Sequence, residues 1–66
     1  MQIIVNGQPR TLETTLTLAD LLVDLALPPR RVAIELNRHI VRRDQYDHTT
    51  LHDGDTLEIV TLVGGG

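Results

Sequence analysis

The spacing of the apolar residues changes along this chain, and that change constrains the fold more than any other feature of the sequence. From Leu18 to Leu25, four leucines recur at i, i+3, i+4 and i+7, which is the pattern of one face of a helix. Before and after this segment, short apolar runs and alternating apolar and polar residues favour strands. The sequence therefore predicts one helix between two groups of strands.

The first group of strands is predicted to be a hairpin. Met1–Val5 is mostly apolar, and Asn6-Gly7 then gives the strongest short signal for a two-residue turn, because both turn positions need positive φ. The returning strand, Gln8–Glu13, contains Pro9, which cannot donate a hydrogen bond to a neighbouring strand. We therefore expect this second strand at an edge of the sheet.

Local signals mark both ends of the predicted helix. Thr17 suits the N-cap position, and Asp20 suits the third helical position of a capping box, where its charge also favours the helix N-terminus. Pro28-Pro29 is expected to end the helix near Leu27, because the residue before a proline disfavours the helical conformation.

The second group is predicted to hold three strands. The first is half-buried, because apolar residues alternate with small or polar ones from Val32 to Asn37. We then expect a turn at Asn37–His39, a short strand at Ile40–Arg42, a loop with one helical turn at Arg43–Thr50, a tight turn at Asp53–Asp55 and a strand at Thr56–Val63. The residues of the loop at 43–50 give no further information.

These elements predict an α+β fold, in which one helix packs across one face of a mixed sheet of four to five strands. We expect the first and last strands to lie together at the centre of the sheet. On the last strand, Leu57 and Ile59 should face the helix, because Glu58 between them should face water.

The same alternation leaves apolar residues on the opposite face of the sheet. Val60 and Leu62 should point away from the core, and we expect them to lie beside Ile4 of the first strand. Exposed apolar patches often mark interaction sites, so we interpret Ile4, Val60 and Leu62 as a partner surface.

The composition excludes several classes of function. The chain's 66 residues predict one domain, 1–66, which is too small to wall a ligand pocket of about 300–1,000 Å³, so we do not expect an enzyme. Six arginines against nine Asp and Glu give a net charge of −3, the wrong sign for coating nucleic acid. The lack of cysteine excludes disulfides and thiolate metal sites and fits a reducing compartment. No segment suits a signal peptide or a membrane span, so we expect a cytoplasmic protein with no membrane partner.

Three glycines end the sequence, and we expect Gly64–Gly66 to be a flexible tail that follows the last strand. When extended, three residues reach about 10 Å, and the missing side chains let such a tail enter a narrow channel of another protein. The Gly66 carboxylate is expected to be ionised at neutral pH and able to attack a phosphorus centre. The chain has no Walker-type glycine loop and no lysine, so we expect a partner enzyme to bind ATP.

Several segments, taken in order and at this length, resemble one family. The sequence is similar along its whole length to the ThiS family of small sulfur carriers, which has the ubiquitin-like β-grasp fold. The resemblance rests on Met1–Gly7, the leucine-rich helix from Thr17, Val32–Asn37 followed by Ile40-Val41, Asp53–Asp55 with Leu57–Val60, and the terminal glycines.

This resemblance implies a reaction at the end of the chain. It places the reactive carbonyl on Gly66, with Gly65 as its required neighbour and Gly64 as a spacer. It implies that a ThiF-type adenylyltransferase uses ATP to form an acyl-adenylate and that sulfur from a persulfide then replaces AMP. The resulting thiocarboxylate would deliver sulfur to a ThiG-type thiazole synthase for thiamine biosynthesis. The chain itself would bind no cofactor.

Two related functions remain as alternatives. The small subunit of molybdopterin synthase, of the MoaD type, shares the glycine end and the thiocarboxylate but is usually longer. A ubiquitin-like modifier would join its terminal glycine to lysines of target proteins. Against the second alternative, Thr61–Val63 stands where ubiquitin has arginine-bearing residues before its glycines.

The histidines and arginines permit two further hypotheses. His39, His48 and His52 could form a metal-binding module, but His48 and His52 lie in a segment with helix-breaking residues, so we expect three solvated side chains and no metal site. The pairs Arg30-Arg31 and Arg42-Arg43 could bind phosphate, although such pairs more often lie on a solvated surface.

Overall fold

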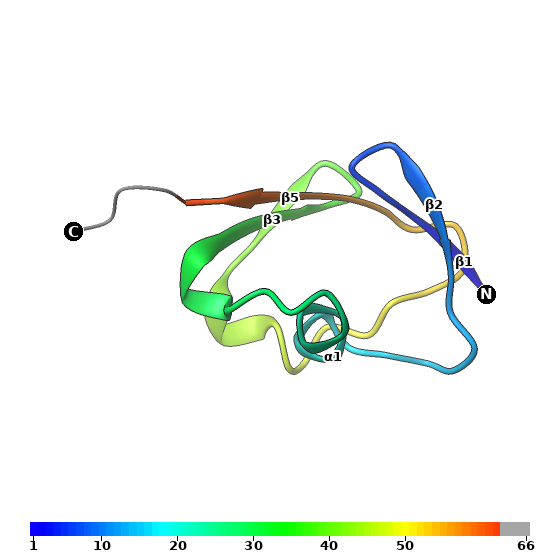
Figure 1. Ribbon diagram of the computed structural model, residues 1–66, viewed down its shortest axis with the longest axis horizontal. Coiled ribbons are helices and arrows are strands. Elements are labelled where there is room, and N and C mark those ends of the chain that lie inside the picture. The colour runs from blue at the N-terminus through cyan, green and yellow to red at the C-terminus, as the bar shows by residue number, and fades with distance from the viewer. Residues whose placement is uncertain (63–66) are drawn as a thin grey trace.

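A five-stranded mixed sheet with one α-helix across one face forms the fold, which confirms the predicted α+β class (Figure 1). The computed structural model describes residues 1–62, so the glycines at 64–66 lie outside the described residues. The elements are β1 (Gln2–Val5), β2 (Gln8–Thr11), α1 (Leu18–Asp24), the 3₁₀ helix η1 (Pro29–Arg31), β3 (Val32–Leu36), β4 (His39–Val41), the 3₁₀ helix η2 (Arg43–Gln45) and β5 (Thr56–Thr61).

The strands lie in the order β2-β1-β5-β3-β4, with β5 at the centre. The pair β1–β5 is parallel and the other pairs are antiparallel, so the predicted contact between first and last strands is confirmed. β2 lies at the sheet edge, as Pro9 predicts. Strand bounds differ from the predicted ones by one or two residues, which is the usual uncertainty at the ends of elements.

The turn between β1 and β2 has the predicted conformation. Asn6 has φ 51° and Gly7 has φ 80°, the two positive values that the hairpin requires. The side chain of Asn6 also reaches β5: its amide nitrogen donates to the Ile59 carbonyl oxygen at 3.1 Å, and its carbonyl oxygen accepts from the Ile59 amide at 2.8 Å. The turn residue therefore extends the bonding between β1 and β5.

Helix α1 starts where the sequence predicts and ends earlier. The Thr17 hydroxyl accepts from the Asp20 amide at 3.1 Å and the Asp20 carboxylate accepts from the Thr17 amide at 3.1 Å, which confirms the capping box. The expected end near Leu27 is wrong, because the helix ends at Asp24 and Ala26 has φ 57°. Pro28 disfavours helix at the preceding residue, and the chain needs two residues before it to reverse out of the helix.

The core lies between α1 and the sheet and includes residues from a loop. The segment 43–50, in which the sequence offered no signal, supplies Tyr46, which is only 4% exposed. The carbonyl oxygens of Tyr46 and Thr49 accept hydrogen bonds from the amides of Ala19 at 3.0 Å and Leu18 at 2.9 Å. The loop thus satisfies two of the amides that a helix N-terminus leaves free. The buried apolar residues are Ile3, Leu12, Leu18, Leu21, Leu22, Val32, Ile34, Tyr46, Leu51, Leu57 and Ile59.

Among residues 1–62, no helix has the length and apolar character needed to cross a membrane.

Candidate functional site

The face of the sheet opposite α1 carries the exposed apolar residues of β5. Leu57 and Ile59 are buried under the helix, as predicted. Val60 is 58% exposed and Leu62 is 50% exposed, so both lie on the open face or at its margin. The alternation of side chains along β5 accounts for both observations.

The predicted position of Ile4 beside Val60 is wrong. Ile4 is 39% exposed on the open face, but the parallel register pairs it with Thr56. Thr56 precedes Val60 by four residues, a distance of about 13 Å along a strand. Glu58 lies between them on the same face, so Ile4 does not form one apolar strip with Val60 and Leu62.

Two residues that sequence reasoning missed lie near Val60. Ala33 of β3 is paired directly with Val60, and Ile40 of β4 is 78% exposed. The alternation that buries Val32 and Ile34 also placed Ala33 on the open face, so a signal for Ala33 was present. The signal for Ile40 was the register of the β3–β4 hairpin, which pairs it with Glu35.

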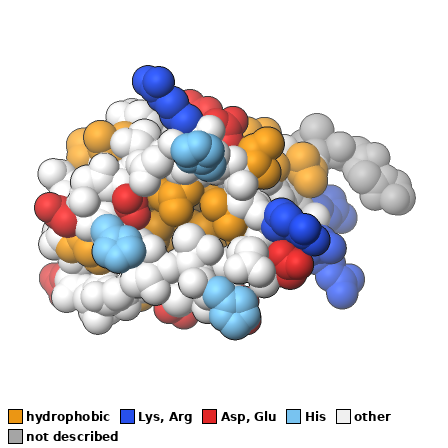
Figure 2. Space-filling model, turned by 180° about the vertical axis from the view of Figure 1, so that it is seen from behind, with side chains coloured by type: hydrophobic (Ala, Val, Ile, Leu, Met, Phe, Trp, Pro, Cys, Tyr) orange, Lys and Arg blue, Asp and Glu red, His pale blue; other side chains and the backbone are white. Residues whose placement is uncertain are grey.

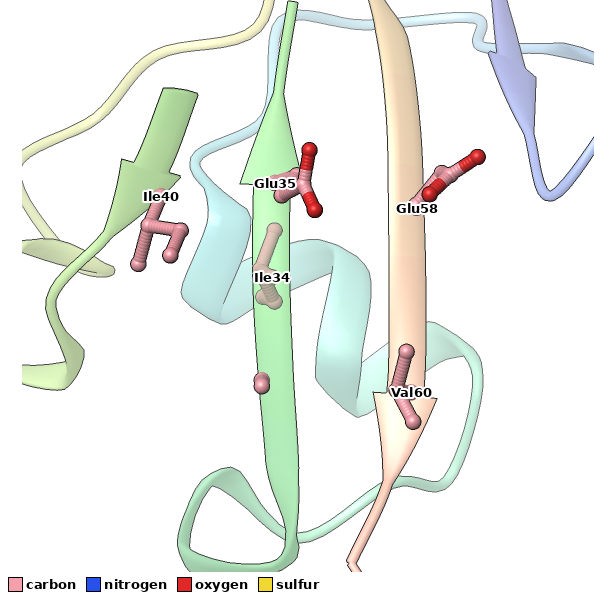
Figure 3. A pocket seen from close by; sticks show the side chains of 6 residues that line it. Ile34, Glu35, Ile40, Glu58 and Val60 are labelled. Atoms are coloured by element: carbon pink, nitrogen blue, oxygen red, sulfur yellow. The ribbon is translucent and has the colours of Figure 1, made fainter. Parts of the chain in front are cut away.

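These residues surround a shallow hollow of about 90 Å³ on the open face. Figure 3 shows Ile40 on one side of it, Val60 on the other, and the carboxylates of Glu35 and Glu58 beside each other at one end. Helix α1 lies behind the strands in this view, so the hollow opens away from the core. The lining residues are Ala33, Ile34, Glu35, Ile40, Glu58 and Val60.

Arginines lie at the end of the molecule where β5 finishes. Arg30 and Arg31 belong to η1, and the Arg31 carbonyl oxygen accepts from the Leu62 amide at 2.6 Å. Arg42 and Arg43 lie at the start of η2. A guanidinium nitrogen of Arg42 is 3.4 Å from the Asp44 carboxylate, and both of these side chains are exposed. Figure 2 shows arginine side chains gathered at this end. The charge near the end of β5 is therefore positive although the whole chain carries −3.

The family model of ThiS matches residues 3–66. The chain belongs to the ThiS family. Its β-grasp fold is also that of a solved relative: the crystal structure of the thiamine biosynthesis protein ThiS from Geobacter metallireducens superimposes with a TM-score of 0.85 at 36% identity, with 100% of both chains covered. The resemblance and the fold inferred from the sequence are thereby confirmed.

This ThiS-family chain is similar to relatives of about its own length and to much longer ones. The Sulfur carrier protein ThiS of Bacillus subtilis is 40% identical over 50 residues, which are 76% of each chain. A thiazole synthase of Paramagnetospirillum magneticum is 39% identical over 66 residues, which are 100% of this chain and 20% of that protein. The chain thus spans about a fifth of the length of the two thiazole synthases that it matches.

The glycines expected to react lie outside the described residues. Gly64, Gly65 and Gly66 follow Leu62 and Val63, and the match to the ThiS family model extends through all three glycines. β5 ends at the opposite end of the molecule from Met1 (Figure 1). The open-face hollow, which Val60 lines, and Arg31, which bonds to Leu62, both lie near the end of β5.

The histidines do not come together in this ThiS-family fold. In the part of the chain that the structure describes, no group of three or more His, Cys, Asp or Glu side chains could hold a metal ion. The three histidine rings lie apart on the face seen in Figure 2. The His48 Nε2 atom lies 3.4 Å from an oxygen of the Asp47 carboxylate, and both side chains are exposed. The hypothesis of a metal-binding module gains no support from these positions.

Proposed function

We propose that this chain is a sulfur carrier of thiamine biosynthesis and that the carboxyl group of Gly66 carries the sulfur. The observation that carries the proposal is the match to the ThiS family model over residues 3–66. Relatives from Bacillus subtilis and Thermus thermophilus, both named "Sulfur carrier protein ThiS", favour this function over supply of sulfur to molybdopterin or attachment to target proteins.

The proposed reaction has three steps at the Gly66 carboxyl group. First, the carboxylate oxygen attacks the α-phosphorus of ATP, forming an acyl-adenylate and releasing pyrophosphate. Second, the terminal sulfur of a persulfide attacks the carbonyl carbon and AMP leaves with the bonding electron pair. A dithiol reductant then cleaves the resulting S–S bond in a third step. Its first thiolate attacks the donor sulfur and releases the thiocarboxylate on Gly66, and its second thiolate displaces the donor thiol as the reductant closes its own disulfide. The absence of a side chain at Gly66 keeps the carbonyl carbon open to both partners.

We assign ATP binding to a partner enzyme of the ThiF type. The hollow on the open face has a volume of about 90 Å³, far below the roughly 300–1,000 Å³ of small-molecule sites, and two carboxylates at its rim repel phosphate. The thiocarboxylate would then serve a ThiG-type thiazole synthase, and both encounters would take place in the cytoplasm. Within this scheme the chain is a substrate and carrier, and the enzymes are its partners.

A pyrophosphate-release assay with the adenylyltransferase of the same organism tests the first step. Deleting Gly66 shortens the chain by about 3.3–3.6 Å and moves the terminal carboxylate away from the α-phosphorus. We expect release to fall at least 100-fold, while the thermal unfolding midpoint stays unchanged because the deletion keeps every residue of the described core. A matched variant, Gly66→Ala, keeps the length and the carboxylate and should be slowed less. Equal release from the deletion variant and the natural chain would refute the proposed role of Gly66.

A further inference from the structure

Two glutamates at the rim of the open-face hollow are cross-strand neighbours, an arrangement that is unfavourable for the isolated chain. Glu35 of β3 and Glu58 of β5 are directly opposite in the antiparallel register, and both are exposed. Like charges at such positions destabilise a strand pair. Neither carboxylate has an ion-pair partner among residues 1–62. Both are therefore open to a positive charge from outside the chain.

An apolar surface lies beside this pair of carboxylates. Ile40 is directly opposite Glu35 on β4, so that Glu58, Glu35 and Ile40 form one row across three strands. In the neighbouring row Ala33 is opposite Val60, and the small side chain of Ala33 leaves the hollow between its larger neighbours. Figure 3 shows this combination of an apolar floor and two carboxylates at one end.

The size and chemistry of the hollow define what it can bind. Its volume of about 90 Å³ suits one side chain of another protein and is too small for a typical small-molecule ligand. An arginine has an apolar stem that can lie along apolar surface and a planar guanidinium whose several N–H groups suit two carboxylates. Hydrogen bonds between guanidinium and carboxylate are among the strongest in proteins. The hollow thus offers an apolar surface for the stem of an arginine and two carboxylates for its guanidinium.

We propose that this hollow receives one arginine side chain of the thiazole synthase, with its stem over Ala33 and its guanidinium between Glu35 and Glu58. The identity of the partner rests on the proposed function. It is supported by the two relatives named thiazole synthase, in which a segment similar to this whole chain makes up 20% of the protein. The charges of the contact are complementary in this proposal: the carrier contributes the two carboxylates, and the synthase contributes the positively charged guanidinium.

Calorimetric titration of the full chain with the purified ThiG-type synthase of the same organism tests the proposal. The double variant Glu35→Gln and Glu58→Gln should bind at least tenfold more weakly, and its affinity should depend less on salt concentration. The control variant, Glu13→Gln with Asp24→Asn, removes the same charge from exposed positions away from the open face and should bind within twofold of the natural chain. Equal affinity of the double variant and the natural chain would overturn the proposal, as would an equal loss in the control.

Filling the hollow gives a second, independent test. Ala33→Leu keeps both glutamates and places a larger side chain where the arginine stem would lie, so binding should again fall at least tenfold. Unchanged binding by Ala33→Leu would contradict the proposed position of the arginine.

The unfolding midpoint of the glutamine double variant should equal or exceed that of the natural chain, because the repulsion between the two carboxylates is removed.

The two proposals fail in different ways. Failure of the natural chain to bind the synthase in either its carboxylate or its thiocarboxylate form overturns the arginine contact. Pyrophosphate release with the adenylyltransferase does not involve the synthase, so it continues to test the proposed function alone.

Discussion

Two asparagines show how much of this fold depends on single side chains. Asn6 and Asn37 both lie in turns at positive φ, 51° and 50°. The Asn6 side chain exchanges two hydrogen bonds with the backbone of Ile59, and the Asn37 side chain accepts from the Thr56 amide at 3.0 Å and donates to the Asp55 carboxylate at 3.0 Å. Each asparagine therefore ties a hairpin turn to the central strand β5 or to the turn that leads into it.

Tyr46 makes the stability of the folded chain depend on pH in the alkaline range. Burial raises the pKa of the Tyr46 phenol from its usual 10.0, an effect that nearby Arg43 partly opposes. The folded chain then holds the phenol proton more tightly than the unfolded chain, so this contribution is complete below about pH 10 and is lost as pH rises through the folded pKa. We expect the free energy of unfolding, measured with denaturant, to fall above about pH 10.

The chain offers a clean way to measure this effect, because Tyr46 is its only tyrosine and it has no tryptophan or phenylalanine. The ultraviolet absorbance of the phenolate therefore reports one group in the native and the unfolded chain. Tyr46→Phe should make the alkaline part of the stability curve flatter. A native Tyr46 that titrates at the same pH as the unfolded chain would contradict the assignment.

Local side-chain signals were predictable and long-range ones were not. The capping box of Thr17 and Asp20 depends on two residues three positions apart, so the sequence contained everything needed to predict it. The burial of Tyr46 depends on how a loop folds against the N-terminus of α1, far away in sequence. No spacing pattern around Tyr46 indicates that contact.

At the scale of elements, the C-terminus of α1 has an alanine at a position where helices usually have glycine. The Ala26 amide donates to the Val23 carbonyl oxygen at 3.0 Å, and the Leu27 amide donates to the Leu22 carbonyl oxygen at 2.9 Å. These two bonds form a Schellman motif, in which the residue at the Ala26 position is usually glycine. Ala26 instead takes the left-handed conformation at φ 57°.

Ala26→Gly should therefore stabilise the chain. The left-handed conformation costs a residue with a Cβ about 1–2 kcal/mol, and the greater freedom of glycine in the unfolded chain offsets about 0.4–1 kcal/mol of the gain. We expect a net stabilisation of about 0.5–1 kcal/mol in denaturant unfolding. The same substitution inside α1, Ala19→Gly, should destabilise by about 0.5–1 kcal/mol. A loss of stability in Ala26→Gly would contradict this description of the helix end.

The sequence predicted the helix and the strands better than it predicted the register between the strands. The alternation in β3 and β5 predicted which side chains are buried, because side-chain direction is fixed within a strand. The position of Ile4 opposite Thr56 depends on the register between two strands more than 50 residues apart. Strand order predicts which strands meet, but side-chain packing across the sheet sets the register, so Ile4 was placed wrongly.

At the scale of the whole molecule, charge is distributed unevenly over the surface around the open face. Arginines lie at the end where β5 finishes, the apolar hollow comes next, and Glu35 and Glu58 lie further from that end. A net charge of −3 does not predict this arrangement, because it adds separate patches together. A partner that binds the open face must match a positive, an apolar and a negative region in that order, which favours one orientation of the bound chain.

The proposed function requires surfaces for partners more than a cleft in the chain itself. Similarity to ThiS proteins extends over the whole sheet and through the terminal glycines. The described residues supply the scaffold and the open face, and the proposed chemistry takes place at residues beyond Leu62. Stability, recognition and reaction are thus assigned to different parts of the chain.

The measurement that tests the sulfur-carrier function most directly is the intact mass of the chain after incubation with ATP, the adenylyltransferase and a persulfide donor. The proposed function predicts a mass gain equal to the replacement of one oxygen by one sulfur, located at Gly66 by fragmentation and lost when ATP is left out. An unchanged mass, or sulfur bound at any other residue, would contradict it.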